Sequence, residues 1–275
     1  MAYEGPLSLD YSKYKSLKLD LSDGIMTVTL SNPAKRNAVS PEMNGELTTI
    51  WQDLWTDPQV KVIILTGDGK DFCAGVDLVA THAKFSSNKV VGGPLNTTTR
   101  VAKQHILNIL DCEKPTLARV RGVAYGMGVN LALACDMVFA SEDARFCDSH
   151  VKVGMVAGDG GVMWPLYCGM HRAKEYLMTG NPVPAKTAAD IGLINHCLPD
   201  GELDAYVRRL AEQLRDLPPH AVNYTKVSLN VMLKQMIGSA FEASLAYEIY
   251  SRTMGDFKEA TAAFVGKRKG QFTGS

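Results

Sequence analysis

The sequence predicts an α/β fold in which a largely parallel sheet is followed by a helical C-terminal portion. Strand-like runs alternate with helical stretches over roughly the first half of the chain, which starts with a hairpin pattern and has only helical patterns after Pro184. A repeated β-then-α order favours parallel sheets with crossover helices. We therefore expect a sheet-containing core over residues 1–195 and a helical portion over residues 196–275.

The first elements follow from apolar periodicity and turn residues. Apolar residues alternate over Leu17–Leu21 and Met26–Leu30 on either side of a Ser-Asp-Gly turn, which is typical of a hairpin. Ser40 and Pro41 supply an N-cap and a first-turn proline for a helix that Asp57 and Pro58 end. Further strands are expected at Val60–Leu65, Thr116–Val120 and Asp136–Ala140.

The C-terminal third reads as a series of helices. We expect them at Ala185–Ile191, Glu202–Leu214, Ala221–Met236, Ser239–Ser251 and Lys258–Phe264. Between Val79 and Asn96 the sequence is polar and contains glycine, so a mobile segment beside the pocket is predicted.

Composition narrows the possible partners and the compartment. The 275 residues carry 29 basic and 29 acidic side chains, so bulk charge favours neither nucleic acid nor an anionic membrane as a partner. No apolar run reaches the roughly 20 residues of a membrane helix. The six cysteines are scattered without a Cys-x-x-Cys pair, and the first residues lack a signal-peptide pattern. A cytoplasmic protein with reduced thiols is predicted.

Two turns rich in small residues could bind one oxyanion. A helix that opens at Gly126-Met127-Gly128 would aim unpaired amide groups outward, and Cys73-Ala74-Gly75 follows a predicted strand. Taken alone, the turn at Gly126–Gly128 is better explained by tight packing. Together they favour a clamp on a carbonyl oxygen.

These segments, together with Asn32–Ala38 and Ala263–Lys269, resemble the crotonase superfamily of enoyl-CoA hydratases and isomerases. The resemblance extends from about Leu17 to Phe272. It implies a crotonase-like ββα spiral core, a helical C-terminal trimerisation portion, and a homotrimer or dimer of trimers. It also implies an oxyanion hole formed by the backbone amides of Ala74 and Met127.

The chain departs from the hydratase pattern at the residues that carry the chemistry. Asn130 and His150 occupy the positions of the two hydratase glutamates, and Asp159 and Trp164 follow. This combination resembles oxocamphor hydrolase-type enzymes, which cleave a carbon–carbon bond in β-diketones. The resemblance implies that His150 and Asp159 activate water and that Asn130 and Trp164 contact the substrate.

Alternative roles remain open for the acidic residues. Asp159 could fix the tautomer of His150, activate water itself, or serve only as a helix N-cap. Asp148 could replace Asp159 as the partner of His150. Asp148 and His150 also imitate a metal pair, but a third ligand is not evident, so no metal is predicted.

The resemblance also implies a site for coenzyme A. Lys35 and Arg36 match positions that meet its phosphates, and Phe264 and Lys267 match positions that reach the nucleotide from a neighbouring subunit. Coenzyme A would enter as part of the substrate, with no separate cofactor. Dinucleotide, Gly-x-Ser-x-Gly and phosphate-loop motifs are missing.

Three functions follow in order of preference. The first is hydrolytic carbon–carbon cleavage (retro-Claisen) of an acyl-CoA or β-dicarbonyl substrate, with the enolate held in the oxyanion hole. The second is an enoyl-CoA hydratase or isomerase with altered acid and base residues. The third is a catalytically silent homologue that acts as a scaffold.

Overall fold

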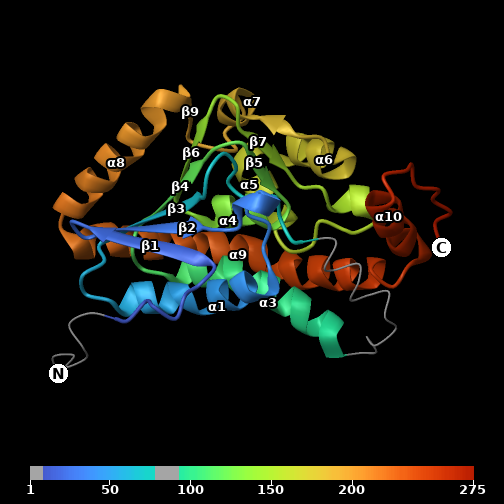
Figure 1. Ribbon diagram of the computed structural model, residues 1–275, viewed down its shortest axis with the longest axis horizontal. Helices are drawn as coiled ribbons and strands as arrows, with labels where there is room; N and C mark the ends of the chain where they lie inside the picture. Colours follow the sequence, from blue (N-terminus) through green and yellow to red (C-terminus); the bar gives the residue numbers. More distant parts are fainter. Residues whose placement is uncertain (1–8, 78–92) are drawn as a thin grey trace.

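The computed structural model describes residues 9–77 and 93–275, and two β-sheets lie at its centre (Figure 1). The strands of the larger sheet follow the order β1-β2-β3-β4-β6-β9, and those of the smaller follow β5-β7-β8. The larger sheet comprises β1 Leu17–Ser22, β2 Ile25–Leu30, β3 Val62–Gly67, β4 Thr116–Val120, β6 Met137–Ser141 and β9 His196–Leu198. The smaller comprises β5 Val123–Tyr125, β7 Arg145–Cys147 and β8 Val183–Pro184.

The predicted hairpin and parallel order are confirmed in the larger sheet. β1 pairs with β2 antiparallel, with Leu17 opposite Leu30, and each later pair in this sheet is parallel. The smaller sheet was not predicted, because its strands of two or three residues are too short to show a period.

Helices cover both faces of the larger sheet. Alternate strand residues, among them Ile64 and Phe139, face α8 Asp200–Asp216, whereas their neighbours Ile63 and Ala140 belong to the main core. The main core is completed by α1 Pro41–Thr56, α3 Gly93–Asp111, α4 Met127–Ala134 and α9 Pro219–Ser251.

Local capping explains where α1 begins. Ser40 accepts a hydrogen bond from the amide of Met43, and Pro41 occupies the first turn, as the sequence predicts. The remaining short elements are η1 Pro33–Lys35, η2 His150–Val153, η3 Gly161–Met163, α5 Trp164–Cys168, α6 Met170–Thr179, α7 Ala185–Asp190 and α10 Gly255–Val265.

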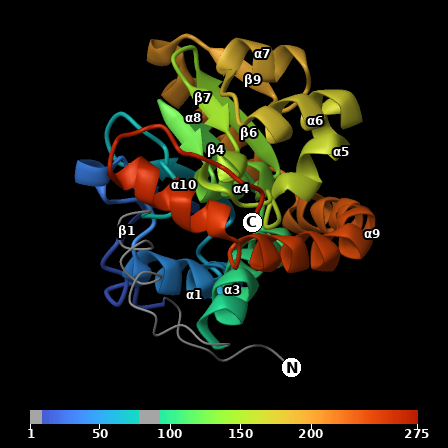
Figure 2. The same ribbon diagram turned by 90° about the vertical axis from the view of Figure 1, so that its right-hand side faces the viewer.

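The C-terminal part differs from its prediction in two respects. The two helices expected around Ser239 are one helix, α9, which runs through Gly238 without a break. The expected boundary at residue 195 is also not a structural division, since β9 pairs with β6 and α8 covers the sheet. Figure 2 shows α10 lying in front of the sheets, on the side where the chain ends.

Other sequence-based expectations have mixed outcomes. All six cysteines are free, as predicted. In the part of the chain that the structure describes, no helix is both long and apolar enough to span a membrane. The segment predicted to be mobile, Val79–Asn96, falls largely on residues 78–92, which lie outside the described residues.

Candidate active site

Two chain segments run side by side at the centre of the site. Cys73 forms a parallel bridge with Ala124: its amide donates to the carbonyl of Val123 at 2.9 Å, and its carbonyl accepts from Tyr125 at 2.9 Å. A Cβ atom at Gly75 would lie only 2.8 Å from the Tyr125 carbonyl oxygen. A small residue is therefore required where the first turn passes the second.

The second turn leaves the amide of Met127 available. Helix α4 starts at Met127 after Gly126, whose φ of 51° suits glycine. The Gly126 amide donates to Cys147 and the Asn130 amide donates to Gly126, whereas the Met127 amide has no acceptor among the described residues. Such an amide at a helix start is suited to bind an oxyanion.

The Ala74 amide, predicted to be the second oxyanion donor beside Met127, already has an acceptor. The Ala74 amide donates to the carbonyl of Arg36 at 2.9 Å, and the Gly75 amide points at the Cys73 sulfur at 3.4 Å. Ala74 is therefore not a free donor. The next amide, that of Val76, has no acceptor among the described residues, and Val76 is 42% exposed.

The direction of the Val76 amide follows from its neighbours. The Gly75 carbonyl accepts from Val39 at 2.8 Å, and the Asp77 amide donates back to Val39 at 3.4 Å. Because successive amides of extended chain point to opposite sides, the Val76 amide points away from Val39. Val76, rather than Ala74, is thus the donor that the geometry offers beside Met127.

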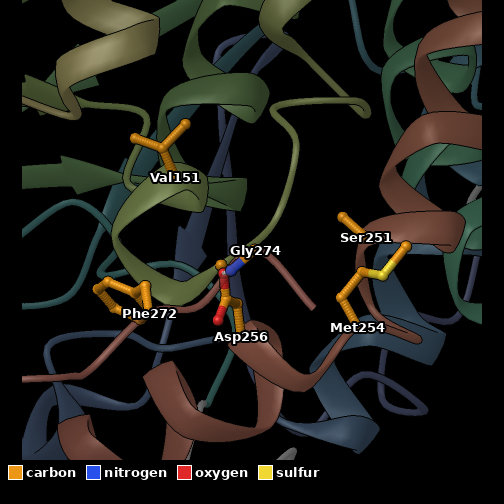
Figure 3. A pocket seen from close by; sticks show the side chains of 7 residues that line it. Val151, Ser251, Met254, Asp256, Phe272 and Gly274 are labelled. Atoms are coloured by element: carbon orange, nitrogen blue, oxygen red, sulfur yellow. Dashed lines mark hydrogen bonds between the residues drawn. The ribbon is translucent and has the colours of Figure 1, made fainter.

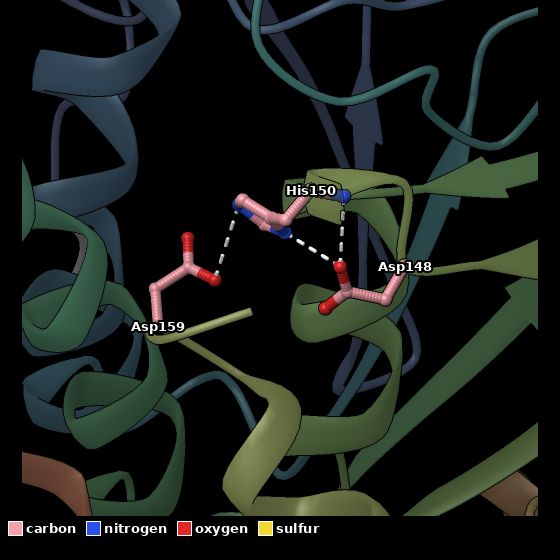
Figure 4. Close-up of side chains that lie close together, drawn as sticks. All are labelled: Asp148, His150 and Asp159. Carbon is pink, nitrogen blue, oxygen red and sulfur yellow. Dashed lines mark hydrogen bonds and ion pairs between the residues drawn. The ribbon is translucent and has the colours of Figure 1, made fainter. Parts of the chain in front are cut away.

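A buried cluster of charged side chains centres on His150 (Figure 4). Its Nδ1 lies 2.6 Å from Oδ1 of Asp148, and its Nε2 lies 3.6 Å from Oδ1 of Asp159. All three residues are buried. The structure therefore brings the predicted pair together and gives both acids a place: Asp148 hydrogen-bonds to the ring, and Asp159 faces the other ring nitrogen.

Local chain geometry positions these three residues. Strand β7 ends just before Asp148, whose Oδ1 also accepts the backbone amide of His150 at 3.1 Å and so starts η2. Asp159 precedes η3, whose N-cap is Gly160 with no side-chain cap bond. The alternative that Asp159 serves only as an N-cap is therefore wrong.

Asn130 lies one turn into α4 and supports Asp159. Its Nδ2 donates to Asp159 Oδ1 at 2.8 Å, and its own Oδ1 is buried without a partner among the described residues. A side chain at residue 160 would collide with this amide, so Gly160 is required there. The amide nitrogen expected to hold substrate is thus already bound to Asp159.

Trp164 does not line the site as expected. Its side chain is completely buried in the main core, where its ring centroid lies 6.4 Å from that of Tyr176. An indole so enclosed supports the loop behind Asp159 by packing. The predicted substrate contact at Trp164 is not supported.

Electrostatics change the role that His150 can take. Burial alone would lower the pKa of the imidazole, but Asp148 and Asp159 outweigh it and raise this pKa to about 10. At neutral pH the ring is therefore a protonated imidazolium that donates a hydrogen bond to Asp148 and forms an ion pair with Asp159. A protonated ring cannot accept a proton from water, so the groups of this cluster that are able to accept one are its carboxylates.

The same three residues offer ligand atoms within 4.8 Å of one another, which is a spacing that could hold a metal ion. A 2.6 Å contact between Nδ1 and Asp148 is the length of a charge-assisted hydrogen bond. The imidazolium already compensates the carboxylate charge. The three side chains are thus paired with one another as an acid–base cluster.

The residues predicted to meet coenzyme A lie at two places. Lys35 and Arg36 flank the first turn, where Arg36 accepts the Ala74 amide and Lys35 pairs with Asp77 at 2.6 Å. Phe264 and Lys267 lie at the end of α10, and the Phe264 ring is 56% exposed.

A separate hollow lies between η2 and the C-terminal residues (Figure 3). Its volume is about 300 Å³, and it shares η2 with the charged cluster. Its lining is Val151, Gly154, Ser251, Met254, Asp256, Phe272 and Gly274. None of the predicted catalytic side chains reaches it.

Sequence reasoning missed two residues that the structure brings to the site. Val76 was passed over because Ala74 begins the small-residue turn, although only hydrogen bonding decides which amide is free. Glu248 on α9 is completely buried. Its burial could have been predicted from the sequence, because it follows Phe241 and Leu245 at helical spacing on the apolar face of the helix.

Comparison with known proteins shows which family the sequence matches. The family model described as enoyl-CoA hydratase/isomerase matches residues 20–275. A putative enoyl-CoA hydratase of Thermus thermophilus is 34% identical over 249 residues, covering 90% of this chain and 97% of the relative. A 1,2-epoxyphenylacetyl-CoA isomerase of Escherichia coli is 29% identical, covering 91% of this chain and 95% of the relative.

Solved structures give the same likeness. An enoyl-CoA hydratase/isomerase from Mycobacterium paratuberculosis superposes with a TM-score of 0.82 at 30% identity, covering 92% of this chain and 99% of that one. A putative enoyl-CoA hydratase from Streptomyces coelicolor has a TM-score of 0.78 at 30% identity and covers both chains completely.

Proposed function

This chain is an enzyme of the enoyl-CoA hydratase/isomerase family, within the crotonase superfamily, and from that premise we propose that it hydrolyses a carbon–carbon bond in a β-dicarbonyl substrate such as a β-ketoacyl-CoA thioester. The observation that carries the proposal is the buried Asp148–His150–Asp159 cluster. His150 stands where hydratases of the family carry one glutamate, and Asn130, which stands where they carry the other, donates a hydrogen bond to Asp159.

The first step uses Asp159 as the base. The Asp159 carboxylate takes a proton from water while the water oxygen bonds to the ketone carbon of the substrate. The His150 imidazolium, held by Asp148 at 2.6 Å, is placed to donate to the developing alkoxide. A donor held rigidly in a buried site stabilises charge better than water does.

The second step uses the two free amides. When the bond between the ketone carbon and the α carbon breaks, its electron pair forms an enolate at the other carbonyl. The amides of Val76 and Met127 stabilise that oxyanion, and removal of one such donor typically costs about 3 to 4 kcal/mol in the transition state. The α carbon then takes up the proton that Asp159 removed from water. The net change is addition of one water and release of a carboxylic acid.

The coenzyme A part of the substrate would meet the exposed cations. Lys35 and Arg36 lie directly beside the first turn, so a thioester carbonyl in the oxyanion hole would extend its nucleotide past them. Phe264 and Lys267 would contact the nucleotide of a neighbouring subunit in a trimer or a dimer of trimers. Salt should weaken such binding.

The second candidate is an enoyl-CoA hydratase or isomerase reaction with altered acid and base residues. It is favoured by the relatives' names, which include a hydroxycinnamoyl-CoA hydratase-lyase of Pseudomonas fluorescens that is 32% identical over 219 residues, covering 78% of each chain. In this reaction Asp159 would direct water to a double bond rather than to a ketone. The silent-scaffold alternative has no support from a site whose buried charges are so arranged.

The test is product analysis in ¹⁸O-labelled water. β-Ketoacyl-CoA thioesters, enoyl-CoA thioesters and free cyclic β-diketones are incubated with the enzyme, and products are identified by mass spectrometry. We expect cleavage of the dicarbonyl compounds with one ¹⁸O in the released acid. Formation of labelled 3-hydroxyacyl-CoA without any cleavage would instead establish the second candidate.

A further inference from the structure

Helix α9 carries a buried carboxyl group next to the loop that holds Asp159. Glu248 is completely buried; its Oε1 accepts from a guanidinium nitrogen of Arg252, and its Oε2 has no hydrogen-bond partner among the described residues. A buried carboxylate oxygen without a donor is costly. Such a cost to stability indicates that Glu248 has a function.

The contact between α9 and the Asp159 loop is close. The Ser244 hydroxyl donates to the Gly158 carbonyl at 2.8 Å. A Cβ atom at residue 158 would lie 2.5 Å from the Ser244 carbonyl oxygen and 2.8 Å from Glu248 Oε2. Glycine thus lets the unpaired carboxylate oxygen lie directly against the residue that precedes Asp159.

The buried acids outnumber the buried cations around this point. Asp148 and Asp159 come from the loops on either side of η2, Glu248 and Arg252 from α9, and His150 from η2 itself. Three carboxyl groups thus share two cations. Burial and the Asp159 charge raise the pKa of Glu248 to about 7, despite the opposing effects of Arg252 and His150.

We propose that Glu248 is a positioning residue that sets the basicity of Asp159: once ionised, its carboxylate against Gly158 makes Asp159 a stronger acceptor for the proton of water. The inference rests on the proposed function in taking Asp159 as the base. Two like charges in one buried site favour protonation of either one. Proton transfer from water to Asp159 relieves that repulsion, so the ionised form of Glu248 is the active one.

This proposal predicts how the rate depends on pH. As Glu248 ionises near pH 7, kcat of the wild-type enzyme should rise by about tenfold, because the neighbouring negative charge makes Asp159 a better acceptor for the proton of water. The Glu248→Gln variant keeps the shape of the side chain but cannot ionise, so it should lose this rise. Its rate should equal the wild-type rate at pH 5.5 and fall about tenfold below it at pH 8.

Two variants serve as comparisons. Glu242→Gln removes an exposed acid of the same helix that pairs with Lys103, and it should leave the pH profile unchanged. Glu248→Asp keeps an ionisable group and should retain a rise in rate, displaced in pH. A merely structural role for Glu248 would lower the rate of the Gln variant equally at all pH values and would overturn the proposal.

A second measurement needs no substrate and separates this inference from the proposed reaction. The His150 ring signal in NMR of ¹⁵N-histidine-labelled protein, assigned by its loss in His150→Gln, should shift near pH 7 in the wild type as Glu248 ionises. Glu248→Gln should abolish that shift, and Glu242→Gln should not. Persistence of the shift in Glu248→Gln refutes the coupling. A shift that disappears while no β-dicarbonyl compound is cleaved refutes the proposed function alone.

Discussion

Asn130 and Asp159 are joined by a buried hydrogen bond of 2.8 Å from the amide nitrogen to the carboxylate. Asn130 occupies the position of a hydratase glutamate, yet it can neither accept nor release a proton in the physiological range. Its role is to hold Asp159 in place. In the proposed mechanism the acid–base chemistry therefore lies on the loop before η3 and not on α4.

The first prediction concerns the base. Asp159→Asn should lower kcat by about 10² or more with little change in substrate affinity, because the amide cannot take a proton from water. Combining it with His150→Gln should hardly lower the rate further, since both groups act in the same step, the attack of water on the ketone, and loss of either one blocks that step. Rates of the single and double variants decide this, with thermal unfolding as the control. Full activity of a folded Asp159→Asn enzyme would remove the base from the mechanism.

The second prediction links His150 to stability. Its folded-state pKa of about 10 lies above the ordinary value of 6.5, so the folded protein holds this proton more tightly than the unfolded chain. The resulting stabilisation is fully present below pH 6.5 and is lost as pH rises towards 10. Urea unfolding should show the free energy of unfolding falling by at least about 1 kcal/mol more in the wild type than in His150→Gln over this range. Parallel pH curves would contradict the assignment of a buried imidazolium.

The third prediction identifies the oxyanion donor on the first turn. Val76→Pro removes the only amide of this turn that lacks an acceptor among the described residues, so kcat should fall by about 10² to 10³. Val76→Ala keeps that amide and should retain nearly full activity. The pair is compared by kcat and by melting temperature. Equal rates for the two folded variants would return the assignment to another donor.

The fourth prediction tests the nucleotide site. Lys35→Ala and Lys267→Ala should each weaken binding of a coenzyme A ester measured by calorimetry, and the loss should shrink at high salt. Lys186→Ala is a suitable control, because Lys186 is exposed and pairs only with its helix neighbour Asp190 among the described residues. Equal affinities of the wild type for the ester and for its pantetheine analogue would show that the nucleotide is not recognised.

The fifth prediction concerns a buried ion pair between α9 and the sheet. Lys226 Nζ lies 2.9 Å from Asp136 Oδ2 and donates to the Lys114 carbonyl, and its side chain is only 5% exposed. Lys226→Ala should lower the free energy of unfolding by about 3 to 5 kcal/mol, because it leaves a carboxylate without its partner. Chemical denaturation measures the loss. The exposed pair Lys234–Asp111 is the control, where Lys234→Ala should cost at most about 1 kcal/mol.

Much of the fold could be predicted from sequence because its signals are local. The hairpin, the N-cap at Ser40 and the strands β3, β4 and β6 follow from periodicity and turn residues within a few positions of each element. The sequence predicted two helices where α9 is a single one, because Gly238 looks like a helix end. Glycine inside a helix costs only about 1 kcal/mol, and packing of the helix overrides that cost. Strands of three residues carry no period at all.

The site could be predicted only as far as residue identity allows. His150, Asp159 and Met127 are recognisable from their motifs, and the structure brings the first two together. The choice of Val76 over Ala74 depends on which amide already has an acceptor, and that is a property of the folded backbone. The imidazolium state of His150 depends on two carboxylates at 2.6 and 3.6 Å, distances that no spacing in the sequence encodes.

Because α9 is continuous, it fixes the distance between Lys226 and Glu248. Lys226 and Glu248 are 22 residues apart on one helix, which is about 33 Å and close to a whole number of turns, so both face inward. Inserting a single residue between them would rotate Glu248 by about 100° relative to the anchored end and carry its carboxyl away from Gly158. The helix would lose either the ion pair between Lys226 and Asp136 or the contact between Glu248 and Gly158. The number of residues in α9 between Lys226 and Glu248 therefore cannot change without displacing Glu248, although most of the residues between them face away from the core.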